Sequence, residues 1–416
     1  MTRKQLVIIG GGPAGLAAAI YAYDSGVKDV MIIEREHRLG GILLQCIHNG
    51  FGLHRFRESL SGPEYAGRYI EEVEKRKIEC YTDTTVLDIS DKKEITYINR
   101  KDGIKTVKAK AVILAMGCRE RSRGALNIAG TRSAGIYSAG TAQKYVNVKG
   151  YMPGKRIVIL GSGDIGLIMA RRMTLEGAKV LAVCEIMPYS SGLKRNIEQC
   201  LNDFDIPLYL NHTITEIRGK SRVEGVSVCK VDENKKPIFG TEMKFDCDTV
   251  LFSVGLIPEN ELSKKAGIEL SPRTKGAVVD ENRQTSVDGI FACGNVLHVH
   301  DLVDYVSEEG SLAGKSAAAY ITGQSKPAKT TDVVCGENVG YCVPQKISAE
   351  AEKVKIFFRV KDVIKDCRVV LSAGGEEIVS VKRQIVTPGE MESIILPKAV
   401  FKKRLSEIEL KVTKLQ

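Results

Sequence analysis

One pattern of apolar and polar positions occurs twice in this chain. In each copy, a short and fully apolar run is followed by a glycine-rich turn, a helical stretch and a second apolar run. The two runs are Leu6–Ile9 and Val30–Ile33 in the first copy, and Ile157–Leu160 and Val180–Cys184 in the second. Apolar runs of this length predict strands, so each copy predicts a strand–helix–strand (βαβ) unit.

The turn after the first strand of each copy fits G-x-G-x-x-G. In this pattern the first glycine permits the tight turn, the second lets backbone approach a pyrophosphate, and the third lets the helix pack closely on the strand. The helix N-terminus then offers N–H groups and a partial positive charge to the diphosphate. The residues predicted to bind the two nucleotides are Gly10, Gly12, Pro13, Ala14 and Gly15 in the first copy, and Gly161, Gly163, Asp164, Ile165 and Gly166 in the second.

An acidic residue closes the second apolar run of each copy. Glu34 and Glu185 each stand 19 residues after the last glycine of their turn. A carboxylate at about this spacing accepts hydrogen bonds from ribose hydroxyls, about 20 residues beyond the turn being typical. Strand, glycines, helix and acid together, occurring twice, favour a duplicated dinucleotide site over glycine-rich turns of an ordinary α/β fold.

Three further apolar runs predict strands that end in turns of small or polar residues. They are Lys110–Gly117, Thr249–Gly255 and Ile290–Asn295. The stretch Ser307–Tyr320 contains several small residues and predicts a helix suited to close packing. Beyond Pro327 the pattern changes to alternation with period two, which predicts a small antiparallel β-sandwich. Its expected strands contain Val354–Val360, Cys367–Leu371, Ile378–Val386 and Ile408–Val412.

Composition predicts a cytoplasmic enzyme of two to three domains. The first strand begins almost at the N-terminus, so we expect no cleavable signal peptide, and no apolar stretch is long enough to predict a transmembrane helix. The net charge of +10 comes from basic residues interspersed with acids, so no nucleic-acid partner is expected. A basic surface of this kind would attract an anionic substrate or an acidic partner.

Eleven cysteines are scattered along the chain without any C-x-x-C pattern. This argues against a disulfide framework and a structural zinc site, and fits a reducing cytoplasm. His298 and His300 flank Val299 and superficially suggest metal ligation. With only six histidines and no further cysteine or histidine to complete a site, we predict that no metal is bound.

Together these features resemble the two-dinucleotide-binding-domain flavoproteins of the pyridine nucleotide-disulfide oxidoreductase superfamily, over residues 1 to about 325. The resemblance implies that the first glycine turn binds FAD and that the inserted second one binds NAD(P)H. It also implies further FAD contacts at Gly41, Gly117, Gly294 and Asn295, and a further NAD contact at Gly255. The superfamily usually has aspartate where Asn295 stands, but the asparagine oxygen could still accept a hydrogen bond from the ribityl chain.

The residues beside Glu185 predict NADH rather than NADPH. A 2′-phosphate next to this carboxylate would be repelled, and NADP sites usually place arginines there. Ile186, Met187 and Pro188 follow the acid instead. Lys194 and Arg195 are close enough in sequence to leave NADPH open.

Disulfide reductases of this superfamily carry a close cysteine pair beside the flavin, and this chain has none at those spacings. One cysteine, Cys46, remains near that position. It could form a sulfenate, as in the NADH peroxidase branch, or it could be a packing cysteine under the flavin, which is the favoured reading. His48 could hydrogen-bond the flavin or protonate a product, or be a satisfied polar group. Cys46 and His48 are therefore the candidate catalytic residues.

Longer stretches, among them Gly41–Phe51 and Asp304–Glu309, resemble a narrower bacterial group encoded beside a glycerol-3-phosphate dehydrogenase-like flavoprotein. This resemblance implies an electron-transfer partner subunit, either such a flavoprotein or an iron–sulfur protein, in a hetero- or homo-oligomer. We therefore expect NADH to reduce FAD and the electrons to leave for the partner. A Cys46-dependent NADH peroxidase or oxidase and a non-catalytic FAD-binding scaffold are the alternatives.

The expected fold is α/β, with two Rossmann-like dinucleotide-binding domains, the second inserted in the first, and a C-terminal β-sandwich-like domain. The FAD domain is expected at 1–115 and 278–325, the NAD(H) domain at 150–275 and the β domain at 330–416. We expect the β domain to dock a partner or its own copy. A domain that merely covers the FAD face is the alternative.

Overall fold

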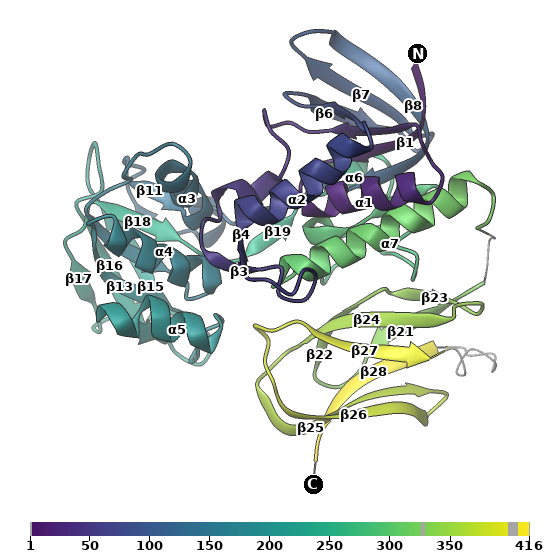
Figure 1. Ribbon diagram of the computed structural model, residues 1–416. Helices are drawn as coiled ribbons and strands as arrows, with labels where there is room; N and C mark the ends of the chain where they lie inside the picture. The colour runs from purple at the N-terminus through teal and green to yellow at the C-terminus, as the bar shows by residue number, and fades with distance from the viewer. Residues whose placement is uncertain (1, 326–328, 398–406, 416) are drawn as a thin grey trace. The chain divides into compact units, whose positions relative to one another are not determined.

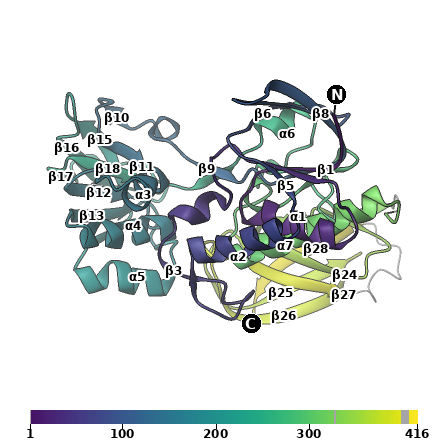
Figure 2. The same ribbon diagram turned by 45° about the horizontal axis from the view of Figure 1, so that its top comes forward.

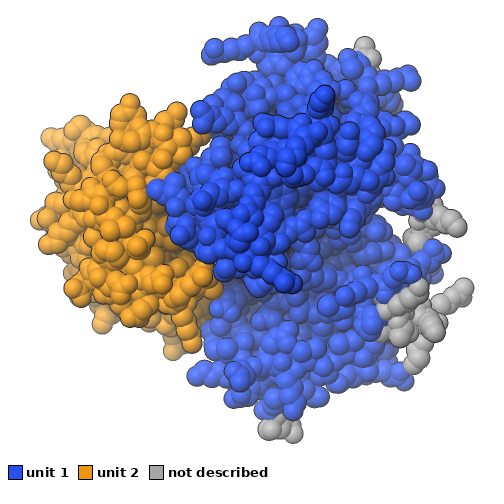
Figure 3. Space-filling model, in the orientation of Figure 1, with its two compact units in different colours: residues 1–118, 258–416 blue, residues 119–257 orange. Residues whose placement is uncertain are grey.

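The structure, a computed structural model, describes residues 2–325, 329–397 and 407–415, so Pro327 and Gln416 lie outside it. The chain separates into two compact units, which Figure 3 colours differently. Unit 1 comprises residues 1–118 and 258–416, and unit 2 comprises residues 119–257. Within the described ranges, no helix combines the length and the apolar character that a membrane crossing requires.

The first large sheet lies in unit 1, where Figure 1 labels its strands β1, β6, β7 and β8. It has seven strands. Its order is β5-β2-β1-β8-β7-β6, and β20 also pairs with β8. The strands β5, β2, β1, β8 and β20 run parallel, whereas β6 and β7 join antiparallel. Their bounds are Thr2–Ile9 (β1), Val30–Ile33 (β2), Glu79–Tyr81 (β5), Thr85–Ile89 (β6), Glu94–Asn99 (β7), Gly103–Leu114 (β8) and Ile290–Ala292 (β20). The predicted strands at Leu6, Val30 and Ile290 are confirmed.

Strand β1 is buried on both faces, which explains its unbroken apolar run. Leu6 and Ile8 belong to one core cluster with the helices α1 (Pro13–Asp24) and α7 (Val303–Ile321). Val7 and Ile9 belong to a second cluster on the opposite face. Because neighbouring side chains of a strand point to opposite faces, both must be apolar here.

Helices α1 and α7 lie side by side in both views (Figures 1 and 2) and touch through glycines. A Cβ atom added at Gly310 would lie 2.2 Å from the carbonyl oxygen of Ala14, and one at Gly314 would lie 2.2 Å from that of Ala18. The small residues of the predicted helix therefore serve the close packing expected. The helix begins at Val303, before the predicted start at Ser307.

Other short elements of unit 1 surround this sheet. They are η1 (Gly41–Gln45), β3 (Asn49–Phe51), β4 (Leu60–Ser61), α2 (Gly62–Lys75), α6 (Glu261–Lys265) and η4 (Gly294–Val296). Helix α2 begins with a capping box, in which Ser61 and Glu64 satisfy each other's backbone N–H groups. Strands β9 (Cys118–Glu120) and β19 (Leu256–Pro258) lie where the chain passes between the units.

Unit 2 contains a five-stranded parallel sheet of order β11-β18-β12-β13-β14. The strands are Ile136–Ser138 (β11), Arg156–Leu160 (β12), Lys179–Glu185 (β13), Leu208–Leu210 (β14) and Thr249–Phe252 (β18). The helices are Ala139–Asn147 (α3), Asp164–Leu175 (α4) and Lys194–Cys200 (α5), with short 3₁₀ turns at Arg123–Leu126 (η2) and Asn202–Phe204 (η3). A second sheet joins Ala129–Gly130 (β10), His212–Arg218 (β15), Gly225–Lys230 (β16) and Met243–Phe245 (β17).

The boundary between the units differs from the prediction. Unit 1 resumes at residue 258 rather than at 278. The intervening segment carries Ala266, Ile268 and Ala277, which are buried in the core cluster that also contains Val7. The segment has no strand-like apolar run of its own, so its membership of this core could not be inferred from periodicity.

The C-terminal residues form two β-sheets. One has the order β23-β21-β28-β25-β26 and the other has the order β22-β24-β27. The strands are Thr330–Cys335 (β21), Val339–Val343 (β22), Lys346–Ser348 (β23), Lys353–Val360 (β24), Ile364–Ala373 (β25), Glu376–Val386 (β26), Glu392–Pro397 (β27) and Glu407–Lys414 (β28). β21 and β28 pair in parallel, so the expectation of a wholly antiparallel domain is wrong for this pair. Strand β21, which begins the domain, therefore lies beside strand β28, which ends it, and the two strands run in the same direction.

Polar contacts join the C-terminal sheets to the rest of unit 1. Arg359 on β24 forms an ion pair with Asp301, and Lys355 on the same strand lies 2.8 Å from a carboxylate oxygen of Glu308. The backbone N–H of Gln345 donates to the carbonyl of Val279 at 3.1 Å. These contacts favour the alternative in which the β domain covers the face of the FAD domain beside α7.

The contact between α1 and α7 makes a matched pair of glycine substitutions informative. Gly314→Ala should lower the free energy of unfolding by about 1–3 kcal/mol, because its new methyl group meets the backbone of α1. Gly67→Ala, in the interior of α2 with open space around it, should raise that free energy by about 0.5–1 kcal/mol. Urea unfolding of both variants measures the difference. Equal stabilities would mean that α1 and α7 can move apart at no cost.

Candidate functional site

The first glycine turn, Gly10–Gly15, leaves no room for side chains at two of its positions. Gly10 has φ +106°, and a Cβ there would lie 2.3 Å from the carbonyl oxygen of Ala115. A Cβ at Gly15 would lie 1.9 Å from the carbonyl oxygen of Gly10. The turn therefore requires glycine for its conformation at Gly10 and for close helix–strand packing at Gly15.

The middle glycine of this turn faces open space. The nearest atom to a Cβ at Gly12 is the Cα of Gly41, at 3.9 Å. Gly12 is also the N-cap of α1, with no side chain capping the helix. The helix N-terminus is thus bordered by two glycines and left accessible, which fits the diphosphate of a dinucleotide such as FAD.

Glu34 lies at the end of β2 and is buried beside the turn. One carboxylate oxygen accepts a hydrogen bond from the N–H of Gly11 at 2.7 Å, and the other accepts one from the N–H of Glu36 at 2.8 Å. Each oxygen keeps a further lone pair for a ribose hydroxyl. Glu34 therefore ties the turn to β2 and remains able to bind the ribose as predicted.

The second turn, Gly161–Gly166, repeats this geometry in unit 2. Gly161 has φ +102°, and a Cβ there would lie 2.0 Å from the carbonyl oxygen of Ser253. A Cβ at Gly163 would find no atom nearer than 3.6 Å. Glu185 accepts hydrogen bonds from the N–H of Ser162 at 2.9 Å and from the N–H of Met187 at 3.0 Å. Both units thus pair a glycine turn with a buried glutamate, and in unit 2 the Ser162 hydroxyl also donates to Glu185, at 2.8 Å.

The two turns differ at the first position of the helix. Asp164 stands where the first turn has Pro13, and its carboxylate accepts hydrogen bonds from the N–H of Leu193 at 2.9 Å and the amide of Asn196 at 2.6 Å. Asp164 therefore holds the start of α5 against the turn. The side chain of Ile165, also predicted to bind NAD, packs against the core of unit 2. Its backbone, at the first turn of α4, is the part left for the nucleotide.

The remaining predicted contacts lie on turns that follow strands. Gly117 and Gly255 both adopt positive φ, at +74° and +100°, after β8 and β18. Gly294, with φ +74°, lies against Ala14, and a Cβ there would be 2.8 Å from that of Ala14. This places the Gly294–Asn295 turn beside the first turn of α1. The side-chain oxygen of Asn295 accepts the N–H of His300 at 3.0 Å, so only one of its lone pairs remains for a ligand.

A buried carboxylate that the sequence reasoning missed holds this turn. Glu309 on α7 accepts the N–H of Gly294 at 2.8 Å and the Nε–H of Arg283 at 2.8 Å. The Nε2 atoms of His298 and His300 lie 3.2 and 3.1 Å from its two oxygens. Burial raises the pKa of Glu309, but the neighbouring groups, Arg283 among them, outweigh it and hold that pKa well below its usual range. The sequence signal that could have indicated this buried carboxylate was Glu309 itself, an acidic residue among the small residues of the predicted helix.

The same cluster corrects one expectation about metal binding. The prediction of no bound metal considered only a further cysteine or histidine as the third ligand of His298 and His300, but the carboxylate of Glu309 lies within reach of both. The guanidinium of Arg283 already forms an ion pair with this carboxylate. Burial, and after it the charge of the nearby His300, lowers the pKa of His298 to about 4. The arrangement works as a hydrogen-bonded ion pair that fixes the turn beside α1, and the guanidinium disfavours a cation in the same place.

The candidate catalytic residues follow the 3₁₀ helix that begins at Gly41. Burial raises the pKa of the Cys46 thiol to about 12, and its sulfur donates to the carbonyl of Ile42 at 3.4 Å. His48 is half-buried, its Nδ1 lies 3.2 Å from the carbonyl oxygen of Asn49, and its ring packs on Phe51. A thiol with so high a pKa is a poor nucleophile, which favours the packing role for Cys46.

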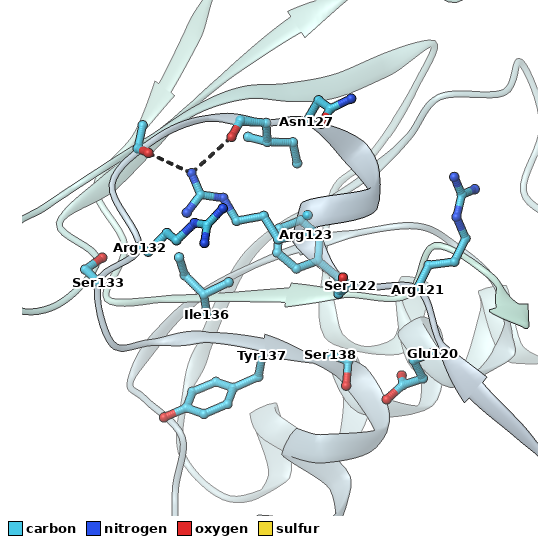
Figure 4. A pocket seen from close by; sticks show the side chains of 14 residues that line it. Glu120, Arg121, Ser122, Arg123, Asn127, Arg132, Ser133, Ile136, Tyr137 and Ser138 are labelled. Atoms are coloured by element: carbon cyan, nitrogen blue, oxygen red, sulfur yellow. Dashed lines mark hydrogen bonds between the residues drawn. The ribbon is translucent and has the colours of Figure 1, made fainter. Parts of the chain in front are cut away.

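A pocket of about 760 Å³ in unit 2 is lined by residues of the segment 120–133, by β11 and by Phe252 at the end of β18 (Figure 4). None of its lining residues belongs to the second glycine turn. Arg121, Arg123 and Arg132 line the pocket. Arg123 donates to the carbonyls of Ile128 and Gly130, at 3.0 and 2.9 Å, so this guanidinium shapes the loop. The sequence analysis did not single out these arginines, which fall between two predicted strands.

Comparisons with known proteins agree with this geometry. The family described as pyridine nucleotide-disulphide oxidoreductase matches residues 4–310. The chain is 27% identical over 330 residues to a thioredoxin reductase of Mycolicibacterium smegmatis, covering 77% of this chain and 95% of that protein. It is 28% identical over 337 residues to an NADH oxidase of Methanocaldococcus jannaschii, covering 77% and 68% of the two chains.

Among solved structures, the chain resembles the thioredoxin reductase of T. acidophilum. The TM-score is 0.64 at 26% identity, and the match covers 78% of this chain and all of that one. The α/β fold with Rossmann-like sheets is therefore shared with thioredoxin reductases.

The buried histidine predicts how stability depends on pH. His298 titrates at about 4 in the folded chain instead of 6.5, so unfolding takes up a proton between these values. The free energy of unfolding should therefore fall as pH drops from 6.5 to 4, by up to about 1.4 kcal/mol per pH unit from this residue. His298→Gln should flatten that slope, whereas His37→Gln, at an exposed position, should not. Urea unfolding at several pH values measures both, and equal slopes in the two variants would contradict this assignment.

Proposed function

Because the chain belongs to the pyridine nucleotide-disulphide oxidoreductase family, we propose that it passes electrons between NAD(H) and a separate redox protein. It is an FAD-dependent NAD(P)H oxidoreductase, as its family and its relatives are. FAD supplies the redox chemistry when bound, because it accepts a hydride equivalent and gives the electrons up again. What is proposed is that NADH is the reduced nucleotide and that the electron acceptor is a separate redox protein.

The observation that carries the proposal is two complete nucleotide turns in a chain without the close cysteine pair of the disulfide reductases. By their name, the relatives called thioredoxin reductase reduce thioredoxin. Here the first cysteine after this turn in the sequence is Cys46, and burial raises its pKa to about 12. Without a reactive cysteine pair beside the flavin, the electrons are expected to pass to an acceptor other than a disulfide in this chain, bound as a separate protein.

In this scheme the protein's own groups bind the two nucleotides and orient them for hydride transfer. The glycine turns place backbone N–H groups at the two diphosphates, and Glu34 and Glu185 are placed to orient the riboses. Glu309 keeps the Gly294–Asn295 turn in position beside α1. Hydride transfer needs no side-chain base, so none is assigned.

NADH is the proposed nucleotide of the second site. The carboxylate of Glu185 is buried beside the turn and would repel a 2′-phosphate. Met187 binds that carboxylate through its backbone, and the exposed Lys194 and Arg195 stand further on, at the start of α5. Comparing NADH with NADPH as the reductant of the flavin decides this part.

The acceptor is proposed by class only, as a flavin- or iron–sulfur-containing protein. The glycerol-3-phosphate dehydrogenase-like flavoprotein expected from the sequence stays one candidate partner. In that case the complex would form a hetero-oligomer, and co-purification of the two proteins would test it.

A pair of valine substitutions separates the two nucleotide sites. Gly163→Val should reduce the rate of flavin bleaching by NADH at least about 100-fold yet keep the bound FAD, because it obstructs only the second diphosphate. Gly12→Val should instead lose FAD. At both positions φ is negative and the added Cβ meets no atom of the protein closer than 3.6 Å, so neither change should prevent folding.

Anaerobic titration with NADH, followed by flavin absorbance, measures both variants. Loss of FAD from Gly163→Val with normal FAD in Gly12→Val would reverse the assignment of the sites. Tight FAD without any bleaching in the wild-type protein would favour the scaffold alternative.

A second candidate function is NADH oxidase or peroxidase activity through Cys46. The relative named NADH oxidase supports the oxidase activity, without pointing to Cys46. Cys46→Ser should leave flavin reduction by NADH unchanged in either case. It should also leave turnover with oxygen or peroxide unchanged within about twofold, because the thiol with its pKa of about 12 is protonated at neutral pH. Stopped-flow reduction and peroxide consumption measure these rates. Loss of peroxide turnover alone would establish the Cys46 mechanism.

A further inference from the structure

Two cysteines of the C-terminal β domain lie in contact with each other. Cys335 ends β21 and Cys342 lies on β22, and their sulfur atoms are 3.5 Å apart. The two strands belong to different sheets, since Cys335 pairs with Leu410 on β28 and Cys342 pairs with Phe358 on β24. The pair therefore bridges the two sheets. It has no part in the nucleotide sites described above.

The two thiols differ in accessibility. Cys342 is buried in the core of the β domain, and its sulfur also lies 3.5 Å from the carbonyl oxygen of Val333. Cys335 is half-buried and lies at the edge of the same core. A partly exposed sulfur in contact with a buried one is the arrangement of an attacking and a resolving thiol.

The surroundings of Cys335 favour its thiolate. The side-chain hydrogen bond between Cys335 and Cys342, aided by the charges of Arg273 and Lys361, lowers the pKa of Cys335 to about 7 against the effect of burial. The pKa of Cys342 is raised by the same contact and by burial. Burial raises the pKa of Cys80 to about 11, so partial exposure alone does not produce such a thiol.

Arg273 also holds the loop between the two cysteines. Its guanidinium donates to the carbonyls of Val339 and Gly340, at 3.3 and 2.7 Å. The backbone N–H of Gly336 donates to the carbonyl of Leu410 at 2.8 Å. The two sulfurs are thus held in contact by a fixed loop, and a disulfide bond of about 2.05 Å requires them to approach by only about 1.5 Å.

We propose that Cys335 and Cys342 form a redox-active dithiol that is oxidised by low-molecular-weight disulfides. The Cys335 thiolate attacks one sulfur of the disulfide RSSR, forming a mixed disulfide and releasing one RS⁻, which takes up a proton. Cys342, as its proton leaves to solvent, attacks the Cys335 sulfur, forms the Cys335–Cys342 bond and releases the second RS⁻. In total, the dithiol loses two electrons and two protons, and RSSR becomes two RSH.

The experiment exposes the reduced full-length flavoprotein to oxidised glutathione at pH 7.5 without oxygen. Free thiols are then alkylated, and peptides are mapped by mass spectrometry. We expect a peptide with the Cys335–Cys342 disulfide to form at least about tenfold faster than glutathione adds to Cys80. Glutathione adducts at Cys335 that never close onto Cys342, or no reaction at Cys335, would overturn the proposal.

Two variants identify the roles of the two thiols. Cys342→Ser should stop the reaction at a stable Cys335–glutathione mixed disulfide, and Cys335→Ser should leave Cys342 unmodified, because the latter is buried. Cys367→Ser, at another buried cysteine of the domain, is the matched control and should react as the wild type does. Flavin content and urea unfolding check that each variant is folded. If a variant fails to fold, the wild-type peptide map still decides the proposal.

Discussion

The buried carboxylate of Glu309 is the interaction on which the FAD-site side of unit 1 depends. A carboxylate removed from water is strongly destabilising unless donors and a cation surround it. Here Arg283 supplies the cation, and Gly294 and the two histidines, from the segment 294–300, supply further partners. Satisfying one charge therefore fixes the Gly294–Asn295 turn, the Arg283 loop and helix α7 relative to one another. Because α7 packs on α1 through glycines, the first glycine turn is held by the same contacts.

The two nucleotide turns are the same physical solution used twice. In each, backbone passes so close to backbone that a Cβ would clash at the first and third glycines, while the middle glycine stays open. In each, a buried glutamate binds the turn and a residue two positions beyond itself. The turns differ at the first helical position, where Asp164 binds the start of α5 and Pro13 has no such role, and at Ser162, whose hydroxyl also donates to Glu185. The duplication therefore preserves the binding geometry and varies only its support.

The C-terminal β domain contacts the segment around His298 and His300, the residues that lie against Glu309. Phe357 packs against His298 and His300, and Arg359 binds Asp301 within the same segment. Arg273 reaches from the other side to the loop that carries Gly340. The β domain thus packs against residues 298–301, which follow the Gly294–Asn295 turn held by Glu309. The thiol pair lies at this junction, where the two sheets of the domain meet.

The sequence by itself determined the two βαβ units, their glycine turns and Glu34 and Glu185, because these depend on local periodicity and on positions where only glycine fits. It also determined four of the C-terminal strands through their alternation. Tertiary structure alone decided that residues 258–277 belong to unit 1, that β21 pairs in parallel with β28, and that Glu309 joins His298 and His300. It likewise brought Cys335 and Cys342 into contact. The first two depend on which distant segments meet in a core. The last two join residues only 7 to 11 positions apart, but they depend on how the chain between those residues is folded. Neither residue spacing nor hydrophobic period encodes these choices.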